Sequence, residues 1–134
     1  MAAHPFPSIE WMQAYADLVA EHPRADALAQ ALQGRYRFAI TPAGGLTETH
    51  RYDLVVAAGP SFTAEPAGEQ AATLTVTADY HRWQGLMTGK ADFVMSFLMR
   101  KIKVDGDVGE VRSRLSDAKP LLDCLSAVPT TFPH

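Results

Sequence analysis

The stretch "LMTGKADFVMSFLMRKIKVDGD", residues 86–107, contains a run of side chains that one buried face cannot explain. From Phe93 to Met99 the chain reads FVMSFLM, which is apolar at every position except Ser96. A helix that packs one face on a core has polar residues on its other face, and a half-exposed strand alternates polar with apolar side chains. The run shows neither pattern, so we expect a helix with two apolar faces. One face packs on the core, and the second face must contact another apolar group.

The residues on either side of this run predict regular structure. AATLTVTADY alternates Leu74, Val76 and Ala78 with threonines, which is typical of a strand that buries one face. Asp79 is suited to cap a helix through YHRWQGLM. The apolar run predicts a helix over residues 91–99, and KIKVDGD alternates as a last strand.

The rest of the chain adds helices at both ends and a β-hairpin. Ser8 is placed to cap a first helix, and Gly34 is placed to end a second one in a left-handed conformation. RYRFAI and LTETHRYDLVVAAG flank a TPAGG turn and predict the hairpin. In order, we expect helices over 8–20 and 25–34, strands over 35–40, 46–59, 61–64 and 71–80, helices over 80–89 and 91–99, a strand over 101–107, and helices over 108–116 and 118–127.

Strands grouped in the middle of a chain, with helices at its ends, are typical of an α+β fold. We therefore expect one mainly antiparallel sheet with helices on one face. The 134 residues suffice for a single domain over 1–134 with its own core. The helix over 8–20 has a wide apolar surface, which predicts that it lies across the sheet.

Composition excludes several classes of function. A net charge of −3 gives no basic footprint for nucleic acid, and no apolar run reaches the ~18 residues that span a bilayer. The single cysteine, Cys124, rules out an internal disulfide, and its apolar setting predicts a small buried side chain. We expect a cytoplasmic protein.

The search for catalytic and metal-binding motifs is negative. The five histidines are scattered without metal-ligand spacing, and no GxSxG nucleophile elbow is present. The segment from Gly106 to Gly109 resembles a phosphate loop, but Asp107 and its acidic neighbours would repel a phosphate, so Asp107 is predicted to cap a helix. We predict no cofactor, no metal and no catalytic residue.

The aromatic and methionine side chains around the apolar run exceed what one core layer uses. Met87, Met95 and Met99 lie among phenylalanines and leucines, and the last predicted helix adds Leu121 and Leu125. Such a cluster is more often core than ligand site, but here one face of the sheet is already expected to be covered by Trp11, Met12 and Tyr15 of the first helix. A cavity for an apolar ligand or an oligomer interface would use the excess.

Three pieces of the chain resemble, in order, the type 2 sterol carrier protein family of sterol- and acyl-chain-binding domains. They are LTVTADY leading into HRWQGLMTGK, then ADFVMSFLMRK, then IKVDGDVGEVRSRL. In that family an alternating strand leads to an Asp-initiated helix, an LxxGK turn, another helix and a KxKxxGD strand. The resemblance covers about residues 28–125, and the matching residues are Leu86, Gly89, Lys90, Lys101, Lys103, Gly106 and Asp107.

The resemblance implies a five-stranded, mostly antiparallel sheet covered on one face by helices, with an apolar tunnel between sheet and helices. The family often has a proline near position 93 and a glycine near position 100, where this chain has Phe93 and Arg100. The chain end TFPH is not a peroxisomal address. Lys90 and Arg100 are candidates for the tunnel mouth, and the candidate tunnel residues are Leu86, Met87, Phe93, Val94, Phe97, Leu98, Leu121 and Leu125.

These observations favour a non-enzymatic binder of a lipid-like molecule, such as a fatty acyl chain, a sterol-like ring or an isoprenoid. The alternative is an interaction or dimerisation module that assists an enzyme acting on an apolar metabolite. A third hypothesis is an enzyme that uses residues such as Asp79, Tyr80, His81 or Asp105. Besides the apolar ligand, a second copy of the chain and a transiently contacted membrane stay open as partners.

Overall fold

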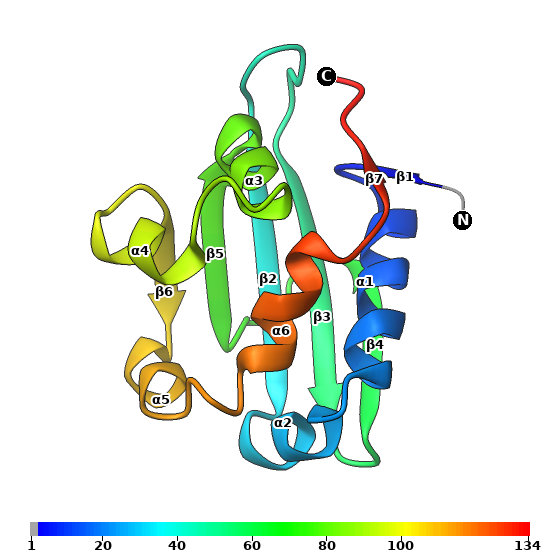
Figure 1. The fold of residues 1–134 in the computed structure, drawn as a ribbon, viewed down its shortest axis with the longest axis vertical. Helices are drawn as coiled ribbons and strands as arrows, with labels where there is room; N and C mark the ends of the chain where they lie inside the picture. Colours follow the sequence, from blue (N-terminus) through cyan, green and yellow to red (C-terminus); the bar gives the residue numbers. More distant parts are fainter. Residues whose placement is uncertain (1–2) are drawn as a thin grey trace.

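The computed structural model describes residues 3–134, and these form a five-stranded sheet with helices on one face (Figure 1). The strands are β2 (Gly34–Thr41), β3 (His50–Ala57), β4 (Ser61–Pro66), β5 (Leu74–Asp79) and β6 (Lys103–Gly106). Their order in the sheet is β4-β3-β2-β5-β6. All neighbours run antiparallel except β2 and β5, which run parallel. The α+β fold with a mostly antiparallel sheet is therefore confirmed.

The helices of residues 3–134 divide into those over the sheet and those at its β6 edge. They are α1 (Ile9–Glu21), α2 (Ala25–Ala31), α3 (Tyr80–Met87), α4 (Phe93–Leu98), α5 (Val108–Ser113) and α6 (Lys119–Asp123), followed by the 3₁₀ turn η1 (Cys124–Ser126). In Figure 1, α3 and α6 lie over the middle of the sheet and α1 lies along β4, whereas α4 and α5 lie beside β6. The helices that carry the apolar run and its neighbour thus sit at the margin.

The two ends of the described chain meet in a small parallel pair of strands. β1 (His4–Pro5) pairs with β7 (Thr130–Thr131), two strands that the sequence did not predict. The indole nitrogen of Trp11 donates a hydrogen bond to Thr130 Oγ1 at 2.9 Å. This contact fixes the start of α1 to the chain end.

Alternation decides which side chains enter the core. Leu74, Val76 and Ala78 of β5 are buried, as the sequence predicted, and the threonines between them are half-buried on the other face. On β2, Phe38 and Ile40 are buried on the helix side. One period-2 pattern on each strand therefore defines the face that the helices cover.

Large aromatic side chains make up the centre of the core. The Phe38 ring lies 5.0 Å from the Trp83 ring of α3 and 5.4 Å from the Tyr15 ring of α1, centroid to centroid. The Trp83 indole also donates to the Ala39 carbonyl at 3.1 Å, so its buried polar atom is paired. These contacts hold α1 and α3 on the same face of the sheet, which confirms that the first helix lies across it.

The opposite face of the sheet is polar and contains one buried ion cluster. The Asp53 side chain is fully buried and accepts hydrogen bonds from Arg35 Nη1 at 2.9 Å and Arg37 Nε at 2.8 Å. Arg35 also pairs with Glu65. A buried carboxylate needs such partners because an unpaired charge costs several kcal/mol. The cluster joins β2, β3 and β4 on the face away from the helices.

The predicted helix caps are confirmed in part. Ser8 Oγ accepts from Trp11 N at 3.1 Å, and Asp79 Oδ1 accepts from Arg82 N at 2.8 Å, as predicted. Asp107 holds the N-cap position of α5, but its carboxylate makes no capping hydrogen bond.

The prediction that Gly34 ends the second helix is wrong. α2 ends at Ala31, and Gly34 is the first residue of β2, with φ +155°. A Cβ on Gly34 would lie 2.3 Å from Thr73 Oγ1, and one on Gly106 would lie 2.2 Å from the Thr73 carbonyl oxygen. Both glycines are needed because β2 and β6 pass this close to Thr73, which bonds to both strands.

We predict that alkaline pH weakens the fold through its buried tyrosines. Burial, with the charges of Asp107 and Glu110, raises the pKa of Tyr36 to about 12, and burial raises that of Tyr15 well above its ordinary value. Unfolded tyrosines ionise near pH ~10, so above this pH the unfolded chain has lost protons that the folded chain keeps. The free energy of unfolding therefore falls as the pH rises toward the folded pKa of Tyr36, about 12.

The variant Tyr36→Phe tests this in urea unfolding measured from pH 8 upward. At pH 8 the variant loses about 1 kcal/mol, because the Tyr36 hydroxyl no longer donates to the Leu32 carbonyl at 2.6 Å. Above pH ~10 its stability falls less steeply than that of the parent. Equal slopes for the two proteins in the alkaline range would contradict the prediction.

Candidate functional site

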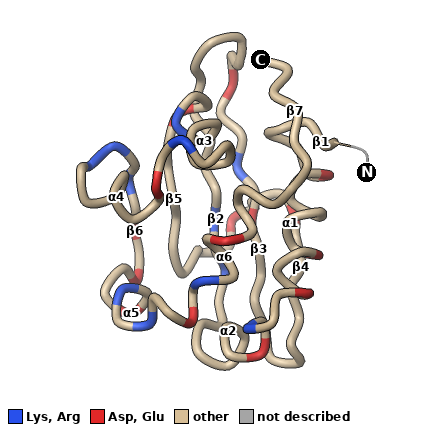
Figure 2. Tube along the Cα trace, viewed as in Figure 1, with Lys and Arg blue, Asp and Glu red and all other residues tan. Residues whose placement is uncertain are grey.

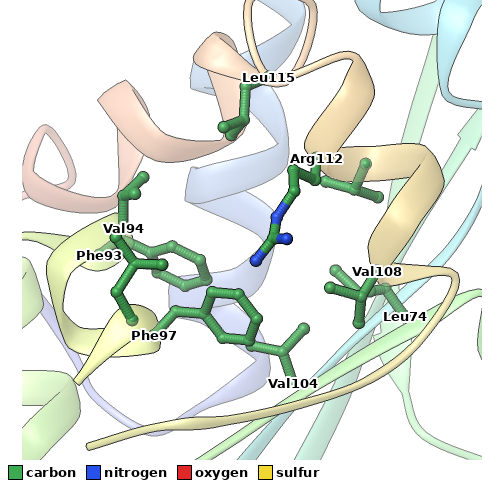
Figure 3. Close-up of a pocket in the computed structure, with 10 residues that line it drawn as sticks. Leu74, Phe93, Val94, Phe97, Val104, Val108, Arg112 and Leu115 are labelled. Carbon is green, nitrogen blue, oxygen red and sulfur yellow. The ribbon is translucent and has the colours of Figure 1, made fainter. Parts of the chain in front are cut away.

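Two internal cavities lie between the sheet and its helices. The outer cavity, about 80 Å³, lies between α4, β6 and α5 (Figure 3). The inner cavity, about 70 Å³, lies between the middle of the sheet, α1, α5 and α6. A larger entrance groove of about 570 Å³ opens to the surface between the α3–α4 connection and α6.

Side chains, not backbone, separate these three spaces. Phe93 and Leu115 line all three, while Leu74 and Val111 line both cavities. Figure 3 shows the Phe93 ring and Leu115 at the border of the outer cavity, with Leu115 across from Phe97. Rotation of a few half-buried or exposed side chains would therefore join the groove to the cavities.

The wall of the inner cavity offers no unpaired buried side-chain nitrogen or oxygen. The Tyr15 hydroxyl donates to the Leu121 carbonyl at 2.5 Å, and the Tyr36 hydroxyl donates to the Leu32 carbonyl at 2.6 Å. Among residues 3–134, every buried side-chain nitrogen and oxygen has a hydrogen-bond partner. A molecule in this cavity would therefore meet a wall that favours hydrocarbon over polar groups.

One cationic side chain reaches the outer cavity. The guanidinium carbon of Arg112 lies 5.9 Å from the centre of the Phe97 ring, a cation–π contact between α5 and α4. Figure 3 shows the Arg112 side chain extending from α5 toward this ring. The outer cavity thus combines apolar walls with one positive charge at its edge.

The edge of the entrance groove is polar. Lys119 and Asp123 of α6 line it beside Leu122 and Leu125. Asp123 Oδ2 lies 3.1 Å from His22 Nε2, which links α6 to the end of α1. The groove therefore combines charged and apolar lining residues.

Local sequence explains how α4 is placed over the outer cavity. Asp92 Oδ2 accepts a hydrogen bond from Met95 N at 2.9 Å and caps the helix, a cap that the sequence analysis did not identify. The helix ends where Arg100 N donates to the Phe97 carbonyl at 3.0 Å and Lys101 N donates to the Ser96 carbonyl at 2.8 Å. This is the Schellman pattern, in which the residue at the position of Arg100 is left-handed.

Arg100 is indeed left-handed, with φ +58°. A side chain at this position costs about 1 kcal/mol relative to glycine, because Cβ crowds the following carbonyl. Glycine suits this position because the Schellman turn requires a left-handed residue there.

The structure brings most of the predicted tunnel residues to these spaces. Phe93, Val94, Phe97 and Leu98 line the outer cavity, Leu121 lines the inner one, Leu125 lines both the inner cavity and the groove, and Leu86 lines the groove. Met87 is buried but lines none of these three spaces. A continuous tunnel and the roles of these residues stay predictions.

The two predicted mouth residues lie elsewhere on the surface. Lys90 lines a separate groove with Met95 and Lys101, and Arg100 lines another one with Phe97 and Lys103. Both side chains are exposed. The cationic residues that line these spaces are instead Arg112 in the outer cavity, Arg37 in the inner cavity and Lys119 in the groove.

Several lining residues were not identified from the sequence. The alternation of the strands over 71–80 and 101–107 could have identified Leu74 and Val104, but the helix predicted over 108–116 gave no indication of which side faces the sheet. The residues of the outer cavity that were not named as candidates are Leu74, Val104, Val108, Val111, Arg112 and Leu115.

The residues of the enzyme hypothesis are not gathered at the cavities. The Asp79 carboxylate caps α3, the Tyr80 hydroxyl accepts from His134 N at 3.2 Å, and His81 is exposed. Within residues 3–134, no three metal-ligating side chains cluster together. Cys124 is buried, and burial, together with the nearby Asp123 charge, raises the pKa of its thiol, which disfavours the reactive thiolate.

Fold and site together define an α+β protein whose helices enclose apolar space over one face of a sheet. The sequence of residues 15–113 matches the model of the SCP-2 sterol transfer family. The chain belongs to this family, whose members bind or transfer lipids, and the resemblance seen in the sequence is confirmed.

Solved structures support the same fold. The crystal structure of sterol carrier protein 2 aligns with a TM-score of 0.74 at 20% identity, covering 89% of this chain and 95% of that one. A conserved hypothetical protein of Thermus thermophilus aligns with a TM-score of 0.73 at 19% identity, covering 95% and 91%. The ubiquinone synthesis protein UbiJ-SCP2 aligns with a TM-score of 0.53 at 16% identity, covering 80% and 87%.

Two further findings are negative. No curated protein matches the sequence. None of the helices in residues 3–134 has the length and hydrophobicity that a bilayer crossing requires.

We predict that Phe93→Ala joins the outer cavity to the inner one. Because the Phe93 ring lines both cavities and the groove, its loss leaves one larger space. The variant should bind a bulky apolar fluorophore at least several-fold more tightly than the parent, as measured by fluorescence titration. It should lose about 1–3 kcal/mol of stability, less than a fully buried phenylalanine would.

Phe62→Ala is the matched control for this variant. Phe62 is also half-buried against the core, but it lies on β4 and lines neither cavity. It should cost similar stability without changing fluorophore binding. If both variants gain the same affinity, loosening of the fold explains the effect and the role given to Phe93 is wrong.

Proposed function

We propose that the chain binds a lipid-like molecule without catalysis, in a space formed when the outer and inner cavities join. The observation that carries this proposal is that Phe93 and Leu115 alone line both cavities and the open groove. In this proposal residues 1–134 act as one sterol-carrier-like domain in the cytoplasm, and its ligand is a fatty acyl chain, a sterol-like ring or an isoprenoid.

Binding requires the cavities to expand. Their volumes of about 80 and 70 Å³ are below the ~300–1,000 Å³ of ordinary small-molecule sites. The walls best able to move are α4 and α5, which lie at the β6 edge, where Phe93 and Phe97 are only half-buried. A ligand chain would displace these side chains and occupy the space between them.

Burial of hydrocarbon supplies the binding energy. Removing a few hundred Å² of apolar ligand surface from water at ~25 cal/mol per Å² gives several kcal/mol before ordering costs. The absence of unpaired buried side-chain nitrogen or oxygen in the inner wall supports a hydrocarbon tail there. A polar or anionic head would stay at the edge, beside Arg112 or Lys119, and the exposed Lys90 and Arg100 remain alternatives for this role.

A second candidate function is that of an accessory module for an enzyme that acts on an apolar metabolite. The likeness to UbiJ-SCP2, which is named for ubiquinone synthesis, favours this reading. In this case the same cavities would hold the metabolite while a partner enzyme, or a second copy of the chain, covers the exposed part of α4.

Native mass spectrometry after incubation with a lipid extract separates these functions. A carrier gives a monomer with one bound lipid, whereas a module that pairs with a second copy gives a dimer. Light scattering on the same sample gives the oligomeric state. An empty protein that also fails to bind palmitate saturably would overturn the carrier proposal.

We predict that Val111→Phe lowers the affinity for palmitate at least tenfold. Val111 of α5 lines both cavities, so the larger ring fills the space that the ligand tail needs. Calorimetric titration gives the dissociation constant. Val55→Phe, the same substitution on the sheet face away from the helices, should bind palmitate as the parent does. Equal affinities of all three proteins would place the ligand outside these cavities.

A further inference from the structure

The outward side of α4 is an exposed apolar surface. Its docking face, as we name it, consists of Met95, Leu98 and Met99, whose exposed fractions are 52%, 58% and 58%. Of the six described residues of α4, only Ser96 is buried. Within residues 3–134, the large exposed hydrophobic residues are these three and Leu115, which is 39% exposed. A grouped apolar surface of this kind marks a contact site.

The docking face is surrounded by positive charge. Residues 80–104 contain five lysines and arginines and one carboxylate, in a chain whose net charge is −3. That carboxylate, Asp92, is held by the helix cap. Figure 2 shows the lysine and arginine positions along α3 and α4, while acidic positions prevail along α1 on the other side.

Apolar and cationic side chains share one groove beside this face. Met95 and Met99 line it together with Arg82, Lys90 and Lys101. Methionine side chains are flexible and adapt to a fluid contact, and the cations complement anionic groups. The combination fits a surface that offers negative charge at its rim and hydrocarbon below it.

Arg100 adds an independent observation. It keeps a charged side chain at a left-handed position, φ +58°, which glycine would fill with less strain. Strained residues of this kind persist where the side chain has a use. The exposed Arg100 side chain follows Met99 in the sequence and lines a neighbouring groove with Lys101 and Lys103, so positive charge continues beyond the groove of Met95 and Met99.

We propose that the docking face seats α4 on an anionic lipid surface. Met95, Leu98 and Met99 enter the outer hydrocarbon, while Lys90, Arg100 and Lys101 bind the headgroups. Leu98 also lines the outer cavity, so docking brings the bilayer to the cavity wall. This inference rests on the proposed function for its biological meaning, but the vesicle contact can be measured without any bound ligand.

Vesicle sedimentation tests the contact directly. The ligand-free protein should partition onto vesicles of phosphatidylcholine mixed with phosphatidylglycerol, bind pure phosphatidylcholine much less, and dissociate as salt is raised. Equal binding to both vesicle types, or none to either, would overturn the proposal.

The double variant Met95→Gln with Met99→Gln should lose at least tenfold in partitioning. Lys90→Gln with Lys101→Gln should lose roughly fivefold for each cation removed. Arg24→Gln with Arg51→Gln is the matched control, because it removes the same charge from exposed positions on α2's N-terminal side and β3. If the control loses as much as the lysine variant, only net charge matters and no docking face exists.

Arg100→Gly separates contact from stability. Relief of the left-handed strain should raise the melting temperature by about 2–4 °C, while loss of the cation lowers partitioning about fivefold. A variant that is more stable yet binds more weakly cannot owe its defect to misfolding. Unchanged vesicle binding in this variant would remove Arg100 from the docking face.

Two further measurements keep this proposal distinct from the proposed function. Met95→Gln with Met99→Gln should bind palmitate as the parent does, since neither residue lines the outer or inner cavity. If the protein docks on vesicles but does not bind palmitate, the carrier function is rejected and the docking proposal stands. If light scattering finds a dimer that these two substitutions dissociate, the face binds a second copy and the membrane proposal is wrong.

Discussion

The packing of Trp83 on Phe38 is the constraint on which the cavities depend. The two rings lie 5.0 Å apart, and the indole hydrogen bond to the Ala39 carbonyl fixes the Trp83 ring over β2. With Tyr15 on the other side of Phe38, three large aromatic side chains fill the middle of the sheet. The same three rings line the inner cavity, so the aromatic centre forms one wall of it, while α4 and α5 cover the β6 edge of the sheet. The cavities are the space left between the filled centre and this looser cover.

The looser cover also explains why a binding site is compatible with a stable fold. Stability comes from the aromatic centre and from the Asp53 ion cluster on the far face, and neither involves α4. The walls that a ligand must displace are Phe93 and Leu115, which are half-buried or exposed in the closed structure. Moving them costs little buried surface. Large volume changes at the edge can therefore leave the sheet and its centre intact.

The sequence predicted the fold better than the site. Alternation on β5 identified its buried face because a two-residue period leaves no ambiguity, and the caps at Ser8 and Asp79 follow from local hydrogen bonding. The prediction for Gly34 was wrong because a glycine is needed there to let Thr73 approach closely. Thr73 is distant in the sequence, so no local pattern reveals this contact. Missed cavity residues such as Val111 lie on a short helix whose orientation depends on long-range packing. The sequence led to the lining residues on α4 and α6, but not to those on α5.

The run FVMSFLM has two apolar faces because α4 has different surroundings on each. Phe93 and Phe97 face the cavities, and Ser96, the small residue of the run, is its buried member. Met95 and Met99 face outward among cations. A helix that only closed a cavity would need polar residues on that outer face, and Arg100 would be better replaced by glycine. The apolar face and the strained arginine both become useful if α4 works at the boundary between stored lipid and a lipid surface, with Leu98 in contact with both.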